Sequence, residues 1–296
     1  MIRRILLFLS LLSILSFANE ARVIMLWKIE HSSLAKPSFL FGTYHSRDKE
    51  INDLPRKVLQ VIESTQTLYT ETTMTKKSHE SIQDFMQASH LLPLRKRLSS
   101  STYKRLQKYI NSENIPLTEH QLSLFKTWAI ALLLTNHAES KTNPHVLFMD
   151  ERLVKSAKER SIPSLGLETP EEQLIYFDML TSQEQELLLI DSMNQAKNDP
   201  YSKALKKWYI KGELQGFSAL QDSFKDKDPH INALDDKLLD SLLTERNTRF
   251  LERIHLILQK HPKENYFFAV GAGHLAEKNG LIQELSNRGY RINKVD

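Results

Sequence analysis

Residues 38–45 read Ser-Phe-Leu-Phe-Gly-Thr-Tyr-His, and residues 266–274 read Tyr-Phe-Phe-Ala-Val-Gly-Ala-Gly-His. In each stretch a short apolar run, typical of a buried strand, leads into the pattern Gly-x-x-His. Glycine lets a chain leave a strand on a path that other residues find strained. The histidine three residues later then lies at the mouth of the strand, where open α/β sheets place their functional groups. The two units therefore predict an α/β sheet that brings His45 and His274 to one edge.

Four other β-rich segments predict further strands of the same sheet. The first forms a hairpin with the strand of the first unit, because a polar turn containing Pro37 separates them. Two of the others end at a glutamate, which adds Glu71 and Glu168 to the predicted edge. Helices lie between successive strands, so neighbouring strands can run parallel in a central mixed sheet. The four segments are residues 22–30, 67–70, 163–167 and 290–295.

Two long helical insertions interrupt this sheet. Residues from about 72 to 160 and from about 170 to 260 carry apolar side chains at helical spacing. Residues 128–134 are continuously apolar, which is too short to span a bilayer and predicts a buried core helix. Because apolar helix faces must pack against something, we expect the insertions to form a cap over the functional edge of the sheet. The sheet and its insertions would then make one α/β domain over residues 19–296.

The N-terminus has the pattern of a secretory signal peptide. Arg3 and Arg4 precede a mostly apolar run at residues 5–17, and a small-x-small cleavage site ends at Ala18. An uncleaved membrane anchor is the alternative, but the run is shorter than the roughly 20 apolar residues that a span needs. We therefore expect residues 1–18 to be removed, leaving a periplasmic or secreted protein without a stable membrane span.

The composition of the chain limits the metal ligands, nucleophiles and partners that it can have. The chain has no cysteine, which excludes disulfides, thiolate metal ligands and a thiol nucleophile. Any metal site must use His, Asp or Glu, a donor set that suits zinc, manganese or cobalt. The net charge of +4 falls to +2 without the two N-terminal arginines, so nucleic-acid binding is not expected. No Walker loop, dinucleotide fingerprint, His-Glu-x-x-His helix or Gly-x-Ser-x-Gly elbow occurs.

Two imidazoles and one or two carboxylates at one sheet edge are typical of a divalent-metal site. A carboxylate that does not bind the ion can serve as general base. The alternatives are that Gly-x-x-His, a short pattern, recurs by chance and that Glu71 and Glu168 are structural carboxylates at strand ends. Arg246 and Asn247 lie one helix before the second unit. They are either solvated helix residues or groups that bind a substrate carbonyl or carboxylate.

Several separated motifs carry a family resemblance, in the order residues 26–29, 39–45, 54–55, 149–150, 166–173, 245–247 and 269–275. With these motifs the sequence resembles the TraB/GumN family, whose distant relatives include Tiki-type metalloproteases. The resemblance covers most of the chain after residue 18, and it implies an α/β core with helical insertions and a candidate metal site. His45, Glu71 and His274 match the two Gly-x-x-His histidines and the strand-end glutamate of the family. Arg246 and Asn247 match its polar pair.

The resemblance implies a metal-dependent hydrolase, peptidase-like, that uses Mn, Co or Zn. In this hypothesis His45, Glu71 and His274 bind the ion, and Glu168 orients a ligand or acts as the base. Arg246 or Asn247 would bind substrate. There are three alternatives: a non-catalytic peptide-binding protein, an accessory protein of envelope polysaccharide export, and a hydrolase that uses the same metal site on a non-peptide ester. Where many members have a glycine-containing turn after the second His-Leu, this chain has Ala-Glu-Lys-Asn-Gly at residues 276–280, a departure that affects the rim of the site.

Overall fold

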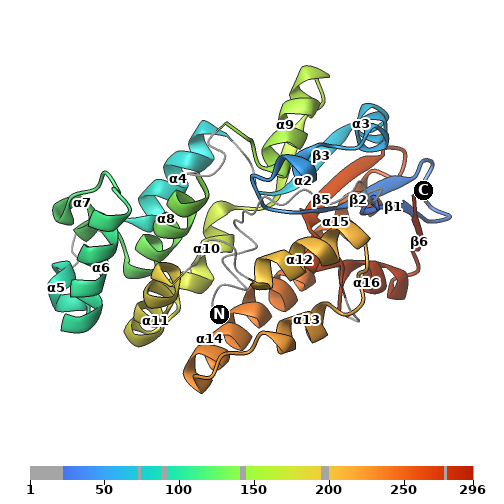
Figure 1. Ribbon diagram of the computed structural model, residues 1–296. Helices are drawn as coiled ribbons and strands as arrows, with labels where there is room; N and C mark the ends of the chain where they lie inside the picture. The colour runs from blue at the N-terminus through green and yellow to red at the C-terminus, as the bar shows by residue number, and fades with distance from the viewer. Residues whose placement is uncertain are drawn as a thin grey trace.

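The computed structural model describes residues 23–72, 75–87, 92–140, 145–194, 200–276 and 279–295. The expected signal peptide lies outside the described residues. The described chain folds around a six-stranded sheet with the order β4-β3-β5-β2-β1-β6 (Figure 1). The strands are β1 (Leu26–Glu30), β2 (Ser38–Thr43), β3 (Thr67–Thr72), β4 (Ser164–Glu168), β5 (Tyr266–Gly271) and β6 (Arg291–Lys294).

The sheet is mixed, as the sequence predicts. Strands β4, β3, β5 and β2 run parallel to one another, whereas β1 pairs antiparallel with both β2 and β6. The predicted hairpin of the first two strands is therefore confirmed. All six residues of β5 are buried, in keeping with the uniformly apolar sequence that a central parallel strand requires.

The register between β2 and β5 brings the two Gly-x-x-His units side by side. Gly42 lies opposite Val270, and Thr43 lies opposite Gly271. A Cβ atom on Gly42 would lie 2.9 Å from a methyl carbon of Leu275, so any larger residue would force the second unit to shift away from β2. Two histidines far apart in sequence thus leave adjacent parallel strands at the same edge.

Helices cover both faces of the sheet. Figure 1 shows α3 and α9 on one side, with α12, α15 and α16 on the other. Of the helices close to the sheet, the first are α2 (Lys49–Asn52), α3 (Arg56–Glu63) and α9 (Met149–Glu159), and the later ones are α12 (Pro200–Lys211), α13 (Phe217–Ser223), α15 (Arg246–Lys260), the short 3₁₀ helix η2 (Ala272–Leu275) and α16 (Leu281–Asn287).

The remaining helices belong to the two insertions. In the first insertion they are α4 (Lys76–Met86), α5 (Leu94–Arg97), α6 (Ser100–Ser112), α7 (Glu119–Ser123) and α8 (Thr127–Ser140), and in the second they are α10 (Pro170–Asp178), α11 (Ser182–Met193), α14 (Pro229–Leu239) and the π-helix η1 (Asp240–Glu245). In the part of the chain that the structure describes, no helix combines the length and hydrophobicity that a membrane span needs.

Helix α3 starts later than Asp53, although aspartate is a common N-cap residue. The helix begins at Arg56 and its N-cap is Pro55. Proline disfavours helical backbone in the residue before it, so the helix cannot include Leu54. The carboxylate of Asp53 instead lies 3.1 Å from the guanidinium of Arg152.

The molecule has two hydrophobic cores. One surrounds the sheet, and the other lies among the insertion helices around Trp128, which is fully buried. Residues 128–134 lie in α8, as the sequence predicts for a core helix. Helix α10 connects the helical core to the sheet, because Leu174 and Phe177 pack into that core while Gln173 reaches the end of β3. The second insertion therefore contacts the sheet at the carboxyl end of β3, as expected for a cap.

Candidate functional site

The carboxyl ends of four parallel strands carry the predicted site residues in spatial order. Glu168 ends β4, Glu71 lies near the end of β3, His274 follows β5 and His45 follows β2. Glu168, Glu71 and His274 are buried, whereas His45 is half-buried. Because the strand order is β4-β3-β5-β2, the two carboxylates occupy one half of the edge and the two imidazoles the other.

The carboxylate of Glu71 lies at the centre of this edge. Its Oε1 accepts a hydrogen bond of 2.7 Å from the backbone N–H of Gly271, in the Gly-x-x-His unit of β5. Its Oε2 pairs with the guanidinium of Arg246 and accepts a bond of 3.3 Å from the side-chain amide of Gln173. The hydrogen bonds of Glu71 thus connect β3 to β5 on one side and to the insertion helix α10 on the other.

Arg246, the first residue of α15, holds both carboxylates. Its Nε donates to Glu168 over 2.9 Å, its Nη2 pairs with Glu168 and Glu71, and its Nη1 donates to the carbonyl of Leu242 over 3.1 Å. Arg249 supplies a second positive charge, 2.9 Å from the other oxygen of Glu168. Arg246 is only 4% exposed, so its charge is held inside the protein by paired carboxylates.

The tautomer of His274 follows from its neighbours. The Nδ2 amide of Asn247 donates to the carbonyl of Asn279 over 3.0 Å, which turns the amide oxygen toward His274. That oxygen lies 2.7 Å from Nδ1 and can only accept, so Nδ1 carries the proton and Nε2 keeps its lone pair. Nε2 accepts from Arg246 over 3.2 Å and lies 3.6 Å from the carboxylate of Glu71.

Burial and charge keep this imidazole neutral. Burial, with the positive charge of Arg246 beside it, lowers the pKa of His274 to about 3, although the charge of Glu71 opposes the shift. Burial would raise the pKa of Glu71, but the charge of Arg246 and the hydrogen bond from the Gly271 N–H outweigh it and hold that pKa well below its usual range. The site therefore presents an ionised carboxylate beside a neutral imidazole, the protonation states that metal ligands need.

His45 faces a carboxylate that sequence reasoning did not assign to the site. Its Nδ1 lies 3.4 Å from Oδ2 of Asp150, the second residue of α9. Asp150 is 2% exposed, and its Oδ1 accepts from the hydroxyl of Thr43 over 3.5 Å. The available signal was its place in the motif at residues 149–150. Gln173, in the motif at residues 166–173, was also missed as a partner of Glu71.

The donor set fits a divalent cation chemically, since it offers imidazole lone pairs and an ionised carboxylate. Glu71 and His274 are adjacent, and both also contact the guanidinium of Arg246. Among the residues that the structure describes, no three His, Asp or Glu side chains are placed to hold one ion together. In this conformation the guanidinium serves as the cation for Glu71.

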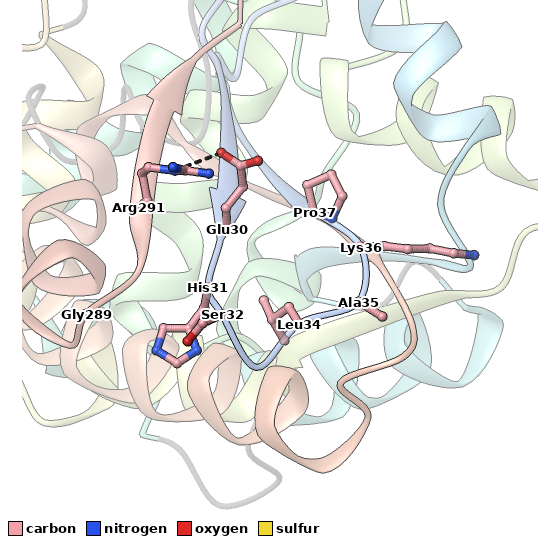
Figure 2. A pocket seen from close by; sticks show the side chains of 9 residues that line it. All are labelled: Glu30, His31, Ser32, Leu34, Ala35, Lys36, Pro37, Gly289 and Arg291. Atoms are coloured by element: carbon pink, nitrogen blue, oxygen red, sulfur yellow. Dashed lines mark hydrogen bonds and ion pairs between the residues drawn. The ribbon is translucent and has the colours of Figure 1, made fainter.

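Two cavities differ in their relation to these residues. One of about 570 Å³ lies between the turn after β1 and the start of β6 (Figure 2), where Glu30 pairs with Arg291 at 3.2 Å. None of the predicted site residues lines it. Another, of about 330 Å³, is lined by Asn247 and Gly273, so it adjoins the His274 side of the site.

Fold and site together define a class: an α/β protein in which paired Gly-x-x-His strands and strand-end glutamates meet at one sheet edge. The chain belongs to the TraB/PrgY/gumN family, whose model matches residues 25–294. This confirms the family resemblance of the sequence motifs.

Relatives with a named activity are distant. The chain is 22% identical to a protein named Metalloprotease TIKI homolog from Amphimedon queenslandica, over 94% of this chain and 62% of that protein. It is 32% identical to a Metalloprotease TIKI homolog from Nematostella vectensis over 21% of this chain and 13% of that one. The match to Metalloprotease TIKI1 from Homo sapiens is 34% over 20% of this chain and 12% of that protein. No solved structure matches the chain.

Proposed function

We propose that this protein is a periplasmic or secreted metal-dependent hydrolase that acts on peptides, with His45, Glu71 and His274 as the metal ligands. The observation that carries the proposal is the pair formed by Glu71 and His274, in which a fixed imidazole lone pair lies beside an ionised carboxylate. Similarity to proteins named metalloproteases supports the same chemistry. Manganese, cobalt and zinc suit these donors.

Each residue of the site has a task in this proposal. When bound, a divalent ion would polarise the scissile carbonyl and lower the pKa of water. The amide oxygen of Asn247 accepts the hydrogen bond from Nδ1–H of His274, which keeps Nε2 unprotonated. Arg246 keeps Glu71 ionised, and Glu168 anchors Arg246 through its own buried carboxylate.

The assignment of Glu168 as an orienting residue has support in these bonds. Both of its oxygens are engaged by arginines, and Arg246 and Arg249 come from the same helix. The side chain of Arg246 is buried, and all three of its nitrogens donate to groups of the protein. Its direct contact with substrate is a prediction that these bonds do not support. Asn247 has better access, since it lines the cavity of about 330 Å³.

The test is a metal analysis and a peptide-cleavage assay on purified residues 19–296. We expect about one equivalent of bound Mn, Co or Zn and cleavage of unstructured peptides, both lost in the double variant His45→Ala/His274→Ala. The variant His31→Ala, in the exposed turn after β1, is the control and should behave as wild type. Full metal content in the double variant would refute the proposed ligands.

One observation favours a second function. Because Arg246 already provides the cation beside Glu71 and His274, the edge is charge-paired without any ion. A non-catalytic peptide-binding protein, or an accessory protein of envelope polysaccharide export, would need no more than this. Wild-type protein that binds peptide but neither retains metal nor cleaves would support this alternative over the hydrolase.

A further inference from the structure

Both histidines of the paired units have a side-chain oxygen near the same ring nitrogen, Nδ1. Nδ1 of His274 donates a hydrogen bond of 2.7 Å to the amide oxygen of Asn247. Nδ1 of His45 lies 3.4 Å from the carboxylate of Asp150. Each holding oxygen comes from the first two residues of a helix, α15 for Asn247 and α9 for Asp150. In both cases the nitrogen left for other contacts is Nε2.

Burying the carboxylate of Asp150 costs free energy unless a polar or charged group compensates for its lost hydration. Asp150 is 2% exposed, and its Oδ2 lies 3.4 Å from Nδ1 of His45. Its Oδ2 accepts no hydrogen bond from the part of the chain that the structure describes, so His45 is the group that it faces. Buried carboxylates are normally well hydrogen-bonded. The contact with His45 is therefore the interaction that accounts for a buried carboxylate at residue 150.

The segment that carries Asp150 is fixed to the loop that carries His45. Arg47 donates to the carbonyl of Val146 over 2.9 Å, and its guanidinium lies 4.5 Å from the ring centre of Phe148. The Nδ2 of Asn52 donates to the carbonyl of Leu147 over 2.9 Å. The distance between Asp150 and His45 is therefore set by contacts on both sides of the pair.

We infer that Asp150 is a positioning residue for His45: it holds the Nδ1 proton and so presents the Nε2 lone pair to the site edge, as Asn247 does for His274. Oxygen acceptors at the far nitrogen fix the tautomer and orientation of ligand imidazoles in this way. The inference deepens the proposed function, since it names what makes His45 a competent ligand.

A purely structural role is the alternative. Asp150 lies in the first turn of α9, where any acid stabilises the helix through its dipole. Glu151, the next residue, is an acid of the same turn and caps the N–H of Phe148. The variant Glu151→Gln is therefore a matched control, because it removes a charge from the same helix end without touching His45.

The test reads the imidazole nitrogens by ¹⁵N NMR of metal-free protein at about pH 8.5, well above the ordinary histidine pKa. In wild type we expect the Nδ1–H form at both His45 and His274. Asp150→Ala should move His45 to a mixture dominated by Nε2–H and leave His274 unchanged. Asp150→Asn should restore Nδ1–H, since its amide oxygen can accept the same bond, and Glu151→Gln should match wild type.

Two results would overturn the inference. One is an Nε2–H tautomer of His45 in wild type, which needs no variant and so stands even if Asp150→Ala fails to fold. The other is an unchanged His45 tautomer in folded Asp150→Ala. Cobalt titration gives the second measurement: Asp150→Ala should weaken binding by about 10–100-fold. If wild type binds no cobalt but His45 still switches tautomer, the proposed hydrolase fails and the positioning role of Asp150 holds.

Discussion

At the scale of single residues, the site depends on one buried guanidinium. Arg246 joins two carboxylates from neighbouring strands and donates to the imidazole of His274. Removing one member of such a buried ion cluster leaves the other charges without partners, which costs more than the pair contributes. Its loss should therefore affect stability more than any surface arginine would.

For Arg246→Met we expect a loss of about 3–5 kcal/mol in the free energy of unfolding. The measurement is denaturant unfolding of metal-free protein at neutral pH. Arg288→Met is the control, because Arg288 pairs with Glu252 at the surface and such pairs contribute at most about 1 kcal/mol. Equal effects of the two substitutions would contradict the structure of the cluster.

The depressed pKa of His274 predicts a defined loss of stability in acid. Between the unfolded value of about 6.5 and the folded value of about 3, only the unfolded chain binds the proton. The free energy of unfolding therefore has its full value, as far as His274 is concerned, above pH 6.5. Below that pH it falls by up to about 1.4 kcal/mol per pH unit. His274→Asn should remove this slope between about pH 6 and 5, above the range where Glu71 protonates in the unfolded chain. A variant with an unchanged slope would argue against a buried neutral ring.

At the scale of elements, the packing of β2 against η2 decides whether the two Gly-x-x-His units meet. Gly42 allows this contact, since a Cβ there would lie 2.9 Å from Leu275 and 3.3 Å from Cα of Ala272. The hydroxyl of Tyr209 in α12 also donates to the carbonyl of Gly42 over 2.9 Å. Strand, short helix and covering helix therefore share one tight contact beside the site.

We expect Gly42→Ala to cost about 1–3 kcal/mol through overpacking and to disturb the resonances of His274. Gly289→Ala provides the comparison, because Gly289 has a φ of 89° but no atom close to the added methyl. That change should cost about 1 kcal/mol from backbone strain and leave His274 unaffected. The measurements are unfolding curves and histidine NMR spectra of both variants. Unchanged His274 resonances in Gly42→Ala would refute the packing argument.

At the scale of the whole molecule, two cores meet through α10 and the π-helix. The helical core contains Trp128, whose ring stacks on Phe177 and whose indole N–H donates to Asp178 over 2.9 Å. The sheet core lies beneath the site. Among the residues that the structure describes, it shares no buried member with the helical core. Each core should therefore respond to its own substitutions.

Trp128→Ala should destabilise the helical core by about 3–5 kcal/mol, because it leaves a large cavity. We expect hydrogen exchange to quicken in α8 and α11 while β2 and β5 keep their protection. Leu124→Ala is the control, since Leu124 is 42% exposed and its loss should change stability by no more than about 0.5 kcal/mol. Equal loss of protection in both cores would show that they unfold as one unit.

The sequence by itself determined the elements and the candidates for the edge. Continuous apolar runs before Gly-x-x-His identified β2 and β5, a polar turn identified the hairpin, and β-rich segments identified β3 and β4. Helical periodicity identified both insertions. These predictions succeed because strand and helix patterns are local, repeating every two or every 3.6 residues. The family motifs added His45, Glu71 and His274 as a set.

Only the tertiary structure decided which side chains touch. The strand order places β5 between β3 and β2, so Glu71 lies beside His274. Nothing in the spacing of Arg246 shows that it is buried between two carboxylates, and nothing local marks Asp150 as the partner of His45. Such contacts join residues about 80 to 200 positions apart. They depend on strand order and helix docking, which long-range packing sets and no local pattern encodes.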